Sequence, residues 1–282
     1  MDEEVLKMIK ANYHTHLLYC NHANGHAEDY IEEALKQGFT ELGITDHAPV
    51  LECFMTKEEY AHNWCHQPMK LDTMFTRYLP EVRKAQQTYK QIRIWTGFEV
   101  EYLPKHQYYI EKLRKEVDYL NLGIHFFTYQ GKCLSSYYDV NSQTIYGYLD
   151  TAVQAMNTGL FNTLVHPDLF MFDYHDRFGN RCFDEDCRYV TRKLLECAIK
   201  NNMYVEINAN GIKNSFVYSD GTAWLYPDLS FWTIAKKYPD LKILIGADAH
   251  DPTDLASKNV QEVCDFAKKL GLNVAEKMEI LH

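Results

Sequence analysis

The sequence predicts an α/β fold in which seven mainly parallel strands form one closed or nearly closed barrel. Short β-type runs alternate with amphipathic helical runs along the chain, and this alternation is typical of a parallel sheet with crossover helices. Seven such units fit a chain of 282 residues, because single α/β barrels commonly have this length. No linker rich in Pro, Gly or Ser divides the chain, so we expect one domain over residues 1–282.

Seven β-type runs give the expected strands. They span residues 10–14, 40–45, 92–99, 118–125, 162–166, 203–208 and 241–247. The expected helices span residues 27–38, 70–90, 105–115, 143–158, 184–201, 228–238 and 256–270. In the first helix, Tyr30, Ile31 and Ala34 fall on one stripe, and Gly38 is a natural C-terminal cap. Four stretches without clear structure follow strands, where α/β barrels place their active sites: about 47–69, 127–142, 167–183 and 209–227.

The composition favours a soluble globular protein in the cytoplasm. Hydrophobic residues make up 46% of the chain, and neither a membrane-length apolar run nor a signal peptide is present. The eight cysteines form no CxxC pair, so we expect reduced thiols. The net charge of −10 argues against binding along nucleic acid, which requires clustered Lys and Arg. An anionic substrate would need a local source of positive charge, such as bound divalent cations.

Ligand-type or hydrogen-bonding side chains stand at the end of every predicted strand. They are, in chain order, His14 and His16, Asp46 and His47, Glu99 and Glu101, His125, His166, Asn208, and Asp248 and His250. In an extended strand, residues two apart face the same side, so His14 and His16 point together. A single strand-end histidine is usually structural, but imidazoles and carboxylates converging from this many strands suit Zn, Mn or Fe. The pattern therefore predicts a divalent metal centre.

Other histidines have different expected roles. His62, His66 and His106 lie away from the strand ends, and we expect them to be solvated. His26 either caps the helix that starts at residue 27 or reaches the site. His175 lies in a charged loop after the fifth strand and is a weaker site candidate.

The order of these motifs resembles the PHP superfamily, the polymerase and histidinol phosphatase phosphoesterases. The matching segments are HxH with a third histidine (His14, His16, His22), TDH (45–47), GFE (97–99), GIH (123–125), VHP (165–167) and DAH (248–250). Within the superfamily, the chain length, the "CNHANG" segment and "EINANG" are most similar to stand-alone bacterial histidinol-phosphate phosphatases.

The resemblance implies a distorted (β/α)7 barrel, similar to a TIM barrel, that holds three divalent ions of Zn, Mn or Fe. Transferred by position, the three ligand sets are His14, His16, Glu99 and Asp248; His22, His47 and His250; and Glu99, His125 and His166. Glu99 would bridge two ions, with Glu101 as the alternative. His26 is the alternative to His22. Asp46, which precedes a ligand, would orient an imidazole.

The implied reaction is hydrolysis of a small phosphomonoester, L-histidinol phosphate, by a hydroxide that bridges two metal ions. Divalent ions suit this reaction because they neutralise phosphate oxygens and lower the pKa of bound water. Arg177 matches one of the family's two phosphate-binding positions. At the other, Lys213 replaces the usual Arg and lacks the two-pronged grip of a guanidinium. The proton for the leaving alcohol would come from His250, Asp46 or a bound water, and the sequence leaves all three open.

Three alternatives remain at this stage. The chain could act on nucleotides or other small phosphates, or as an exonuclease like the PHP domains of polymerases. An amidohydrolase-type barrel also begins with HxH but needs fewer ligands. A non-catalytic PHP module would have lost several ligands, whereas all nine positions here hold His, Glu or Asp.

Overall fold

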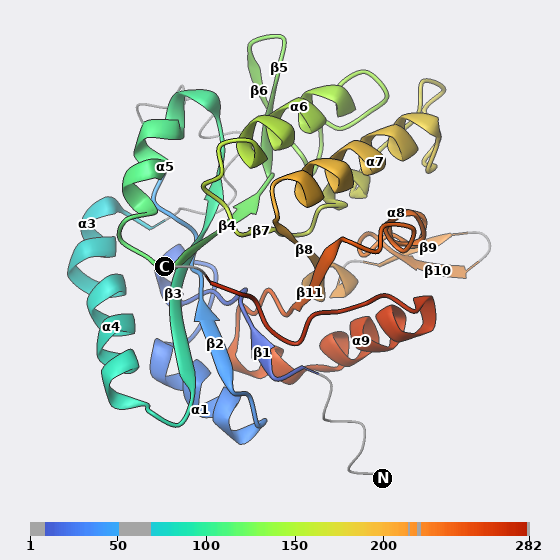
Figure 1. The fold of residues 1–282 in the computed structure, drawn as a ribbon. Helices are drawn as coiled ribbons and strands as arrows, with labels where there is room; N and C mark the ends of the chain where they lie inside the picture. Colours follow the sequence, from blue (N-terminus) through green and yellow to red (C-terminus); the bar gives the residue numbers. More distant parts are fainter. Residues whose placement is uncertain (1–8, 51–68, 214, 219–220, 281–282) are drawn as a thin grey trace.

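The structure is a computed structural model of the chain, and it describes residues 9–50, 69–213, 215–218 and 221–280. Seven parallel strands form one sheet in the order β1-β2-β3-β4-β7-β8-β11 (Figure 1). They are β1 (Ala11–Asn12), β2 (Glu41–Ile44), β3 (Arg93–Glu101), β4 (Tyr119–Gly123), β7 (Thr163–Leu164), β8 (Tyr204–Asn208) and β11 (Lys242–Gly246). Each strand overlaps the run predicted for it, and the predicted α/β barrel is confirmed.

The first and last strands of the sheet meet only at their carboxyl ends. Thr15 and Ala249 form a parallel bridge, in which His16 N donates to Ala249 O at 2.8 Å and Ala249 N donates to His14 O at 3.2 Å. Closer to the start of the strands, the side chain of Asn12 accepts from Ala247 N at 2.8 Å. The barrel is therefore closed where the metal-ligand motifs lie and is open between β1 and β11 at its other end.

Helices cover the outside of the barrel (Figure 1). They are α1 (Ala27–Lys36), α3 (Leu71–Thr73), α4 (Leu79–Thr88), α5 (Gln107–Leu113), α6 (Ile145–Met156), α7 (Glu185–Lys200), α8 (Leu229–Ala235) and α9 (Lys258–Leu270). The predicted stripe of α1 is buried, and Gly38 adopts a φ of +78° just after the helix. At α7, Asp184 accepts from Asp186 N and Cys187 N, which satisfies free N–H groups of the first turn. None of the described helices is long and apolar enough to cross a membrane.

Two of the stretches expected to lack structure contain β-hairpins. The first is β5 (Phe126–Tyr129) paired with β6 (Lys132–Ser135), and the second is β9 (Ser215–Tyr218) paired with β10 (Gly221–Trp224). Gln130 and Gly131 form the two-residue turn of the first hairpin, with φ values of +48° and +77°. Positive φ at both turn positions matches the twist of the two strands, but Gln is an uncommon residue there. The sequence therefore contains only a weak signal for the turn of this hairpin.

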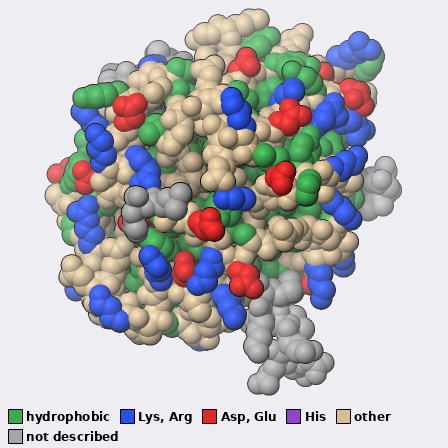
Figure 2. Space-filling view, in the orientation of Figure 1, with side chains coloured by type: hydrophobic (Ala, Val, Ile, Leu, Met, Phe, Trp, Pro, Cys, Tyr) green, Lys and Arg blue, Asp and Glu red, His purple; other side chains and the backbone are tan. Residues whose placement is uncertain are grey.

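The segment after α9 crosses the open end of the barrel (Figure 1). Ala275 N donates to Ile243 O at 2.8 Å, so this segment pairs with the edge of β11 that β1 leaves free. Met278 is buried among Tyr13, Trp95 and Tyr119 inside the barrel. The tail, residues 272–280, therefore fills the end of the barrel opposite the histidines. Figure 2 shows acidic and basic side chains interspersed over this face of the molecule.

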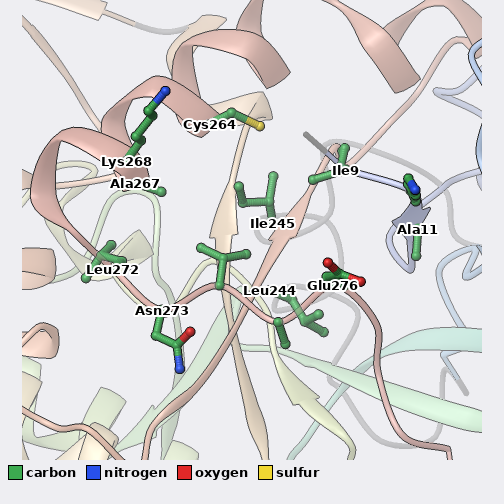
Figure 3. A pocket seen from close by; sticks show the side chains of 13 residues that line it. Ile9, Ala11, Leu244, Ile245, Cys264, Ala267, Lys268, Leu272, Asn273 and Glu276 are labelled. Carbon is green, nitrogen blue, oxygen red and sulfur yellow. The ribbon is translucent and has the colours of Figure 1, made fainter. Parts of the chain in front are cut away.

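A pocket of about 390 Å³ lies beside this tail (Figure 3). Its walls come from residues 9–11, from Leu244 and Ile245 of β11, from α9 and from residues 272–276. None of the predicted site residues lines it, so it is separate from the candidate metal centre.

Candidate metal centre

The predicted ligand residues meet at the carboxyl ends of the strands and are mostly buried. Exposed fractions are 0% for His14 and His16, 2% for Glu99 and His166, 7% for His125 and 5% for Asp248. The side chains of His47 and His250 are 12% and 20% exposed, so they lie toward the mouth of the cluster. Buried imidazoles and carboxylates at this density require charged or hydrogen-bonding partners.

Glu99 on β3 lies at the centre of the cluster. Its Oε2 lies 3.4 Å from His14 Nε2, 3.5 Å from His16 Nε2 and 3.1 Å from His47 Nδ1, and its Oε1 lies 2.9 Å from His166 Nε2 and 3.4 Å from His125 Nε2. The two oxygens thus face two different groups of imidazoles. Gly123 of the GIH motif makes this possible, because a Cβ there would lie 2.4 Å from Glu99 Oε1.

Asp248 joins the same cluster from the segment after β11. Its Oδ1 lies 3.0 Å from His16 Nε2, and 3.5 Å from both His14 Nε2 and His250 Nδ1. The groups of three whose ligand atoms lie within 4.8 Å of one another include His14, His16 and Asp248; His14, Glu99 and His166; His47, Glu99 and His125; and His16, His47 and His250. Carboxylates and imidazoles in such groups are the donor set of divalent transition metals.

The structure brings His22 rather than His26 to the cluster. The His22 ring centroid lies 4.8 Å from that of His250 and 5.1 Å from that of His47. The His26 side chain is 59% exposed and its Nδ1 lies 3.1 Å from Glu81 Oε2 on α4. His26 N also donates to Asp29 at the start of α1, so His26 belongs to the helix start.

Three of the imidazoles have a carboxylate on the side of the ring away from Glu99. Glu101 forms a short hydrogen bond with His125 Nδ1, and Glu206 Oε1 lies 2.8 Å from His14 Nδ1. Asp46 Oδ1 lies 3.8 Å from His16 Nδ1. Each carboxylate faces the ring nitrogen on the far side from Glu99. Glu101 and Glu206 lie within hydrogen-bond distance, an arrangement that orients metal-binding histidines, whereas His16 Nδ1 has no hydrogen-bond partner among the described residues.

Sequence reasoning missed Glu206. A signal was present, because Glu206 lies two residues before Asn208 on β8 and strand alternation turns both to the same side. Glu101 was considered only as an alternative ligand, whereas the structure places it against His125. His106 was expected to be solvated, but it is 3% exposed, so that prediction was wrong. His62 and His66 lie outside the described residues.

The electrostatics of the cluster favour bound cations. Burial alone would lower the pKa of His14, but Glu206, Asp248 and Glu99 raise it well above its usual value. Burial alone would raise the pKa of Glu99, yet the imidazoles of His125, His47 and His14 hold it well below its usual value. Glu99 thus stays ionised and faces positive charge on the surrounding imidazoles. Divalent ions can supply that positive charge when they displace the protons of the imidazoles.

The two basic candidates for phosphate binding lie in different settings. Lys213 Nζ lies 3.0 Å from Asp254 Oδ2, which also accepts from His250 N at 3.3 Å, so Lys213 is linked to the cluster. Arg177 is exposed, and its guanidinium lies 4.7 Å from the ring centroid of Phe178. Among the interactions between described residues, none joins Arg177 to the histidines.

Two tyrosines stand against the imidazoles on the β4–β7 side. The ring of Tyr137 is nearly parallel to that of His125 at 5.7 Å between centroids, and the ring of Tyr226 lies 6.2 Å from that of His166. Gly211 of "EINANG" leaves room for Tyr226, because a Cβ there would lie 2.2 Å from Tyr226 Cδ2. Burial raises the pKa of Tyr226 well above its usual value, so its phenol stays neutral.

Comparison with known proteins agrees with this geometry. The family model described as "PHP domain" matches residues 12–210. The chain belongs to the PHP family. The match covers most of the chain and includes every predicted metal ligand up to His166.

The relatives extend the likeness to nearly the whole chain. A histidinol-phosphatase of Bacillus subtilis is 24% identical over 281 aligned residues, which cover 88% of this chain and 96% of that protein. A histidinol phosphate phosphatase structure from Lactococcus lactis, in complex with zinc, L-histidinol and phosphate, has a TM-score of 0.65 at 15% identity and covers 96% of this chain and 98% of its own. A Listeria monocytogenes structure provisionally named histidinol phosphatase has a TM-score of 0.66 at 19% identity, covering 88% and 98%. These structures share the fold of this PHP chain.

Proposed function

We propose that this PHP chain is a metal-dependent phosphatase that hydrolyses L-histidinol phosphate to L-histidinol and phosphate, acting as one domain. The observation that carries the proposal is the cluster around Glu99, where one buried carboxylate contacts five imidazoles that follow four different strands. The names of the Bacillus and Lactococcus proteins supply the substrate. The alignment with the Bacillus protein spans nearly the full length of both chains, which supports a shared activity.

We propose that the cluster holds three divalent ions of Zn, Mn or Fe. The ligand sets are His14, His16, Glu99 and Asp248; His22, His47 and His250; and Glu99, His125 and His166. Glu99 suits a shared ligand because its two oxygens face different groups of imidazoles. Five buried carboxylates, the ligands Glu99 and Asp248 together with Glu101, Glu206 and Asp46, offset much of the charge of three such ions. Bound divalent ions would supply charge neutralisation and a lowered pKa for water.

The residues at the mouth of the cluster suit contact with the substrate. Asp46 is fully buried behind His16, so we assign the orientation of His16 to it. Burial and the neighbouring His16 lower the pKa of His250 to about 3, so His250 suits a ligand, and we assign proton donation to the leaving alcohol to a bound water. Lys213 would bind a phosphate oxygen that displaces the carboxylate of Asp254 from its ammonium group. We propose Arg177 as a second phosphate-binding residue because it matches a phosphate-binding position of the family. Tyr137 and Tyr226 offer aromatic faces to the organic part of the substrate.

The decisive assay measures phosphate release from L-histidinol phosphate, nucleoside monophosphates and short single-stranded DNA, with Zn, Mn and Fe tested separately. We expect turnover of L-histidinol phosphate to exceed the other two. Preferred turnover of a nucleotide would contradict the proposed substrate, L-histidinol phosphate, but would still agree with phosphatase activity. Near-normal activity in both His14→Ala and Asp248→Ala would contradict the site itself.

A further inference from the structure

Glu206 is a buried carboxylate that receives hydrogen bonds from three directions. It extends from β8 with 2% of its surface exposed. Its Oε1 lies 2.8 Å from His14 Nδ1, and its Oε2 accepts from His166 N at 3.2 Å and from Asn208 Nδ2 at 3.0 Å. It therefore joins a histidine after β1 to the backbone of a histidine after β7.

The direction of these hydrogen bonds follows from the turn after β8. Asn208 Oδ1 accepts from Asn210 N at 2.8 Å and from Gly211 N at 3.3 Å, which fixes the orientation of the Asn208 amide. Its Nδ2 therefore donates to Glu206 Oε2, and also to Asp248 Oδ2 at 3.2 Å. A backbone N–H always donates, so His166 N also donates to Glu206. Oε2 of Glu206 therefore acts only as an acceptor, and a carboxylate accepts at Oε1 as well.

The same reasoning assigns the proton on His14. An imidazole facing an acceptor-only carboxylate places its proton on that side, so Nδ1 of His14 carries hydrogen and donates to Glu206. Nε2 then faces the space between Glu99 Oε2 and Asp248 Oδ1, at 3.4 and 3.5 Å, where a metal ion would take the place of its proton. Within the described part of the chain, this buried Nε2 has no hydrogen-bond partner. It is therefore available for a metal ion.

We propose that Glu206 is a positioning residue of the metal centre, which fixes the metal-binding tautomer of His14 and couples His14 to the backbone of His166. The inference rests on the metal centre of the proposed function. The space around Glu206 is shaped for it, because a Cβ on Gly246 of β11 would lie 1.6 Å from Glu206 Oε1. Gly246 leaves room for the Glu206 carboxylate, and the side-chain amide of Asn208 donates a hydrogen bond to it.

The test is Glu206→Gln, which keeps the shape of the side chain and removes its charge. Glutamine has one acceptor oxygen, so its amide N–H₂ would face either His14 or the two donors His166 N and Asn208 Nδ2, which share one oxygen of Glu206. If the amide faces His14, the imidazole must accept at Nδ1 and carry its proton on Nε2, where the metal binds. We expect the affinity for Zn²⁺ or Mn²⁺, measured by chelator competition on the full chain, to fall about 10- to 100-fold.

The matched control is Glu41→Gln at the opposite end of the barrel. Glu41 is also buried and also faces three donors, Tyr13 Oη, Trp95 Nε1 and Lys277 Nζ, but it contacts no predicted ligand. We expect both variants to lose stability and only Glu206→Gln to lose metal affinity. We also expect saturating metal to restore most of the turnover of Glu206→Gln.

Unchanged metal affinity in Glu206→Gln would overturn the proposal. An equal loss in Glu41→Gln would also overturn it, because the effect would then be one of general stability. Metal affinity is measured without substrate, so it does not depend on which substrate the protein hydrolyses. Failure of the unaltered chain to hydrolyse L-histidinol phosphate would therefore contradict the proposed function and not the role of Glu206.

Discussion

At the scale of single residues, the cluster depends on which nitrogen each imidazole turns inward. Glu101 and Glu206 each hold the Nδ1 of one histidine, and the Nε2 of that ring then faces Glu99. His47 is reversed, since its Nδ1 lies 3.1 Å from Glu99. The residues that meet in the cluster were predictable because the HxH, TDH and DAH motifs stand at the ends of predicted strands. The tautomers were not, because they depend on partners from distant strands.

His22→Ala compared with His26→Ala tests the assignment in the first loop. Only the ring of His22 lies near those of His47 and His250, so we expect His22→Ala to bind less metal per chain and to lose at least about tenfold in activity, since removing even an outer partner costs about 10- to 100-fold. His26→Ala should retain metal and activity. Elemental analysis of the two purified variants measures the metal. The reverse result would assign the ligand to His26.

Glu41 predicts a pH effect far from the metals. Burial alone would raise its pKa, but Lys277, Trp95 and Tyr13 bring the pKa below its usual value. Because the folded pKa is lowered, the carboxylate stabilises the fold above the ordinary pKa of Glu and loses this effect as pH falls through the lowered value. We expect Glu41→Gln to reduce the free energy of unfolding by about 1–3 kcal/mol at pH 7.

The difference between Glu41→Gln and the unaltered chain should shrink as the pH falls through the lowered pKa of Glu41, because the carboxylate then becomes protonated. Urea unfolding at a series of pH values from 7 downward measures it. A difference that stays constant or grows on acidification would show that the Glu41 charge is not the stabilising element.

At the scale of elements, the helices and barrel strands were predictable because their apolar residues repeat with helical or strand periods. The two hairpins were not predicted, since their four-residue strands carry little periodicity and Gln130 and Gly131 give only a weak turn signal in the first. The placement of Tyr226 was equally hidden, because it depends on contact between the turn after β8 and the segment before α8. In the sequence, this contact is reflected by the glycine at position 211, where a side chain would collide with Tyr226.

Gly211→Ala tests that contact. The new Cβ would lie 2.2 Å from Tyr226 Cδ2 and 2.4 Å from Tyr226 O, so the ring must leave its present position beside His166. We expect a loss of about 1–3 kcal/mol in stability from overpacking, together with a raised KM for the substrate. In Gly159→Ala, where no neighbour lies within 4 Å of the new Cβ, stability should fall through the positive φ while KM stays unchanged. An unchanged KM in Gly211→Ala would remove Tyr226 from substrate binding.

At the scale of the whole molecule, a net charge of −10 is unfavourable for an enzyme of phosphate esters unless cations are bound. Metal bound only to the folded state also stabilises it, by about 2.7 kcal/mol at a free concentration 100 times Kd. We expect removal of metal with a chelator to lower the thermal midpoint by on the order of 5–10 °C. Differential scanning calorimetry with and without chelator measures the shift, and an unchanged midpoint would contradict a bound metal centre.

The closure of the barrel sets when the centre can form during synthesis. Thr15 meets Ala249 only after most of the chain exists, and Met278 N donates to Tyr13 Oη across 265 positions. A nascent chain emerges from its N-terminus, so His14 and His16 leave the ribosome long before Asp248. The early part of the chain therefore carries a pair of strong metal-binding side chains without their partners. Its final assembly is a late, long-range event, and a chain truncated before residue 248 cannot complete the centre.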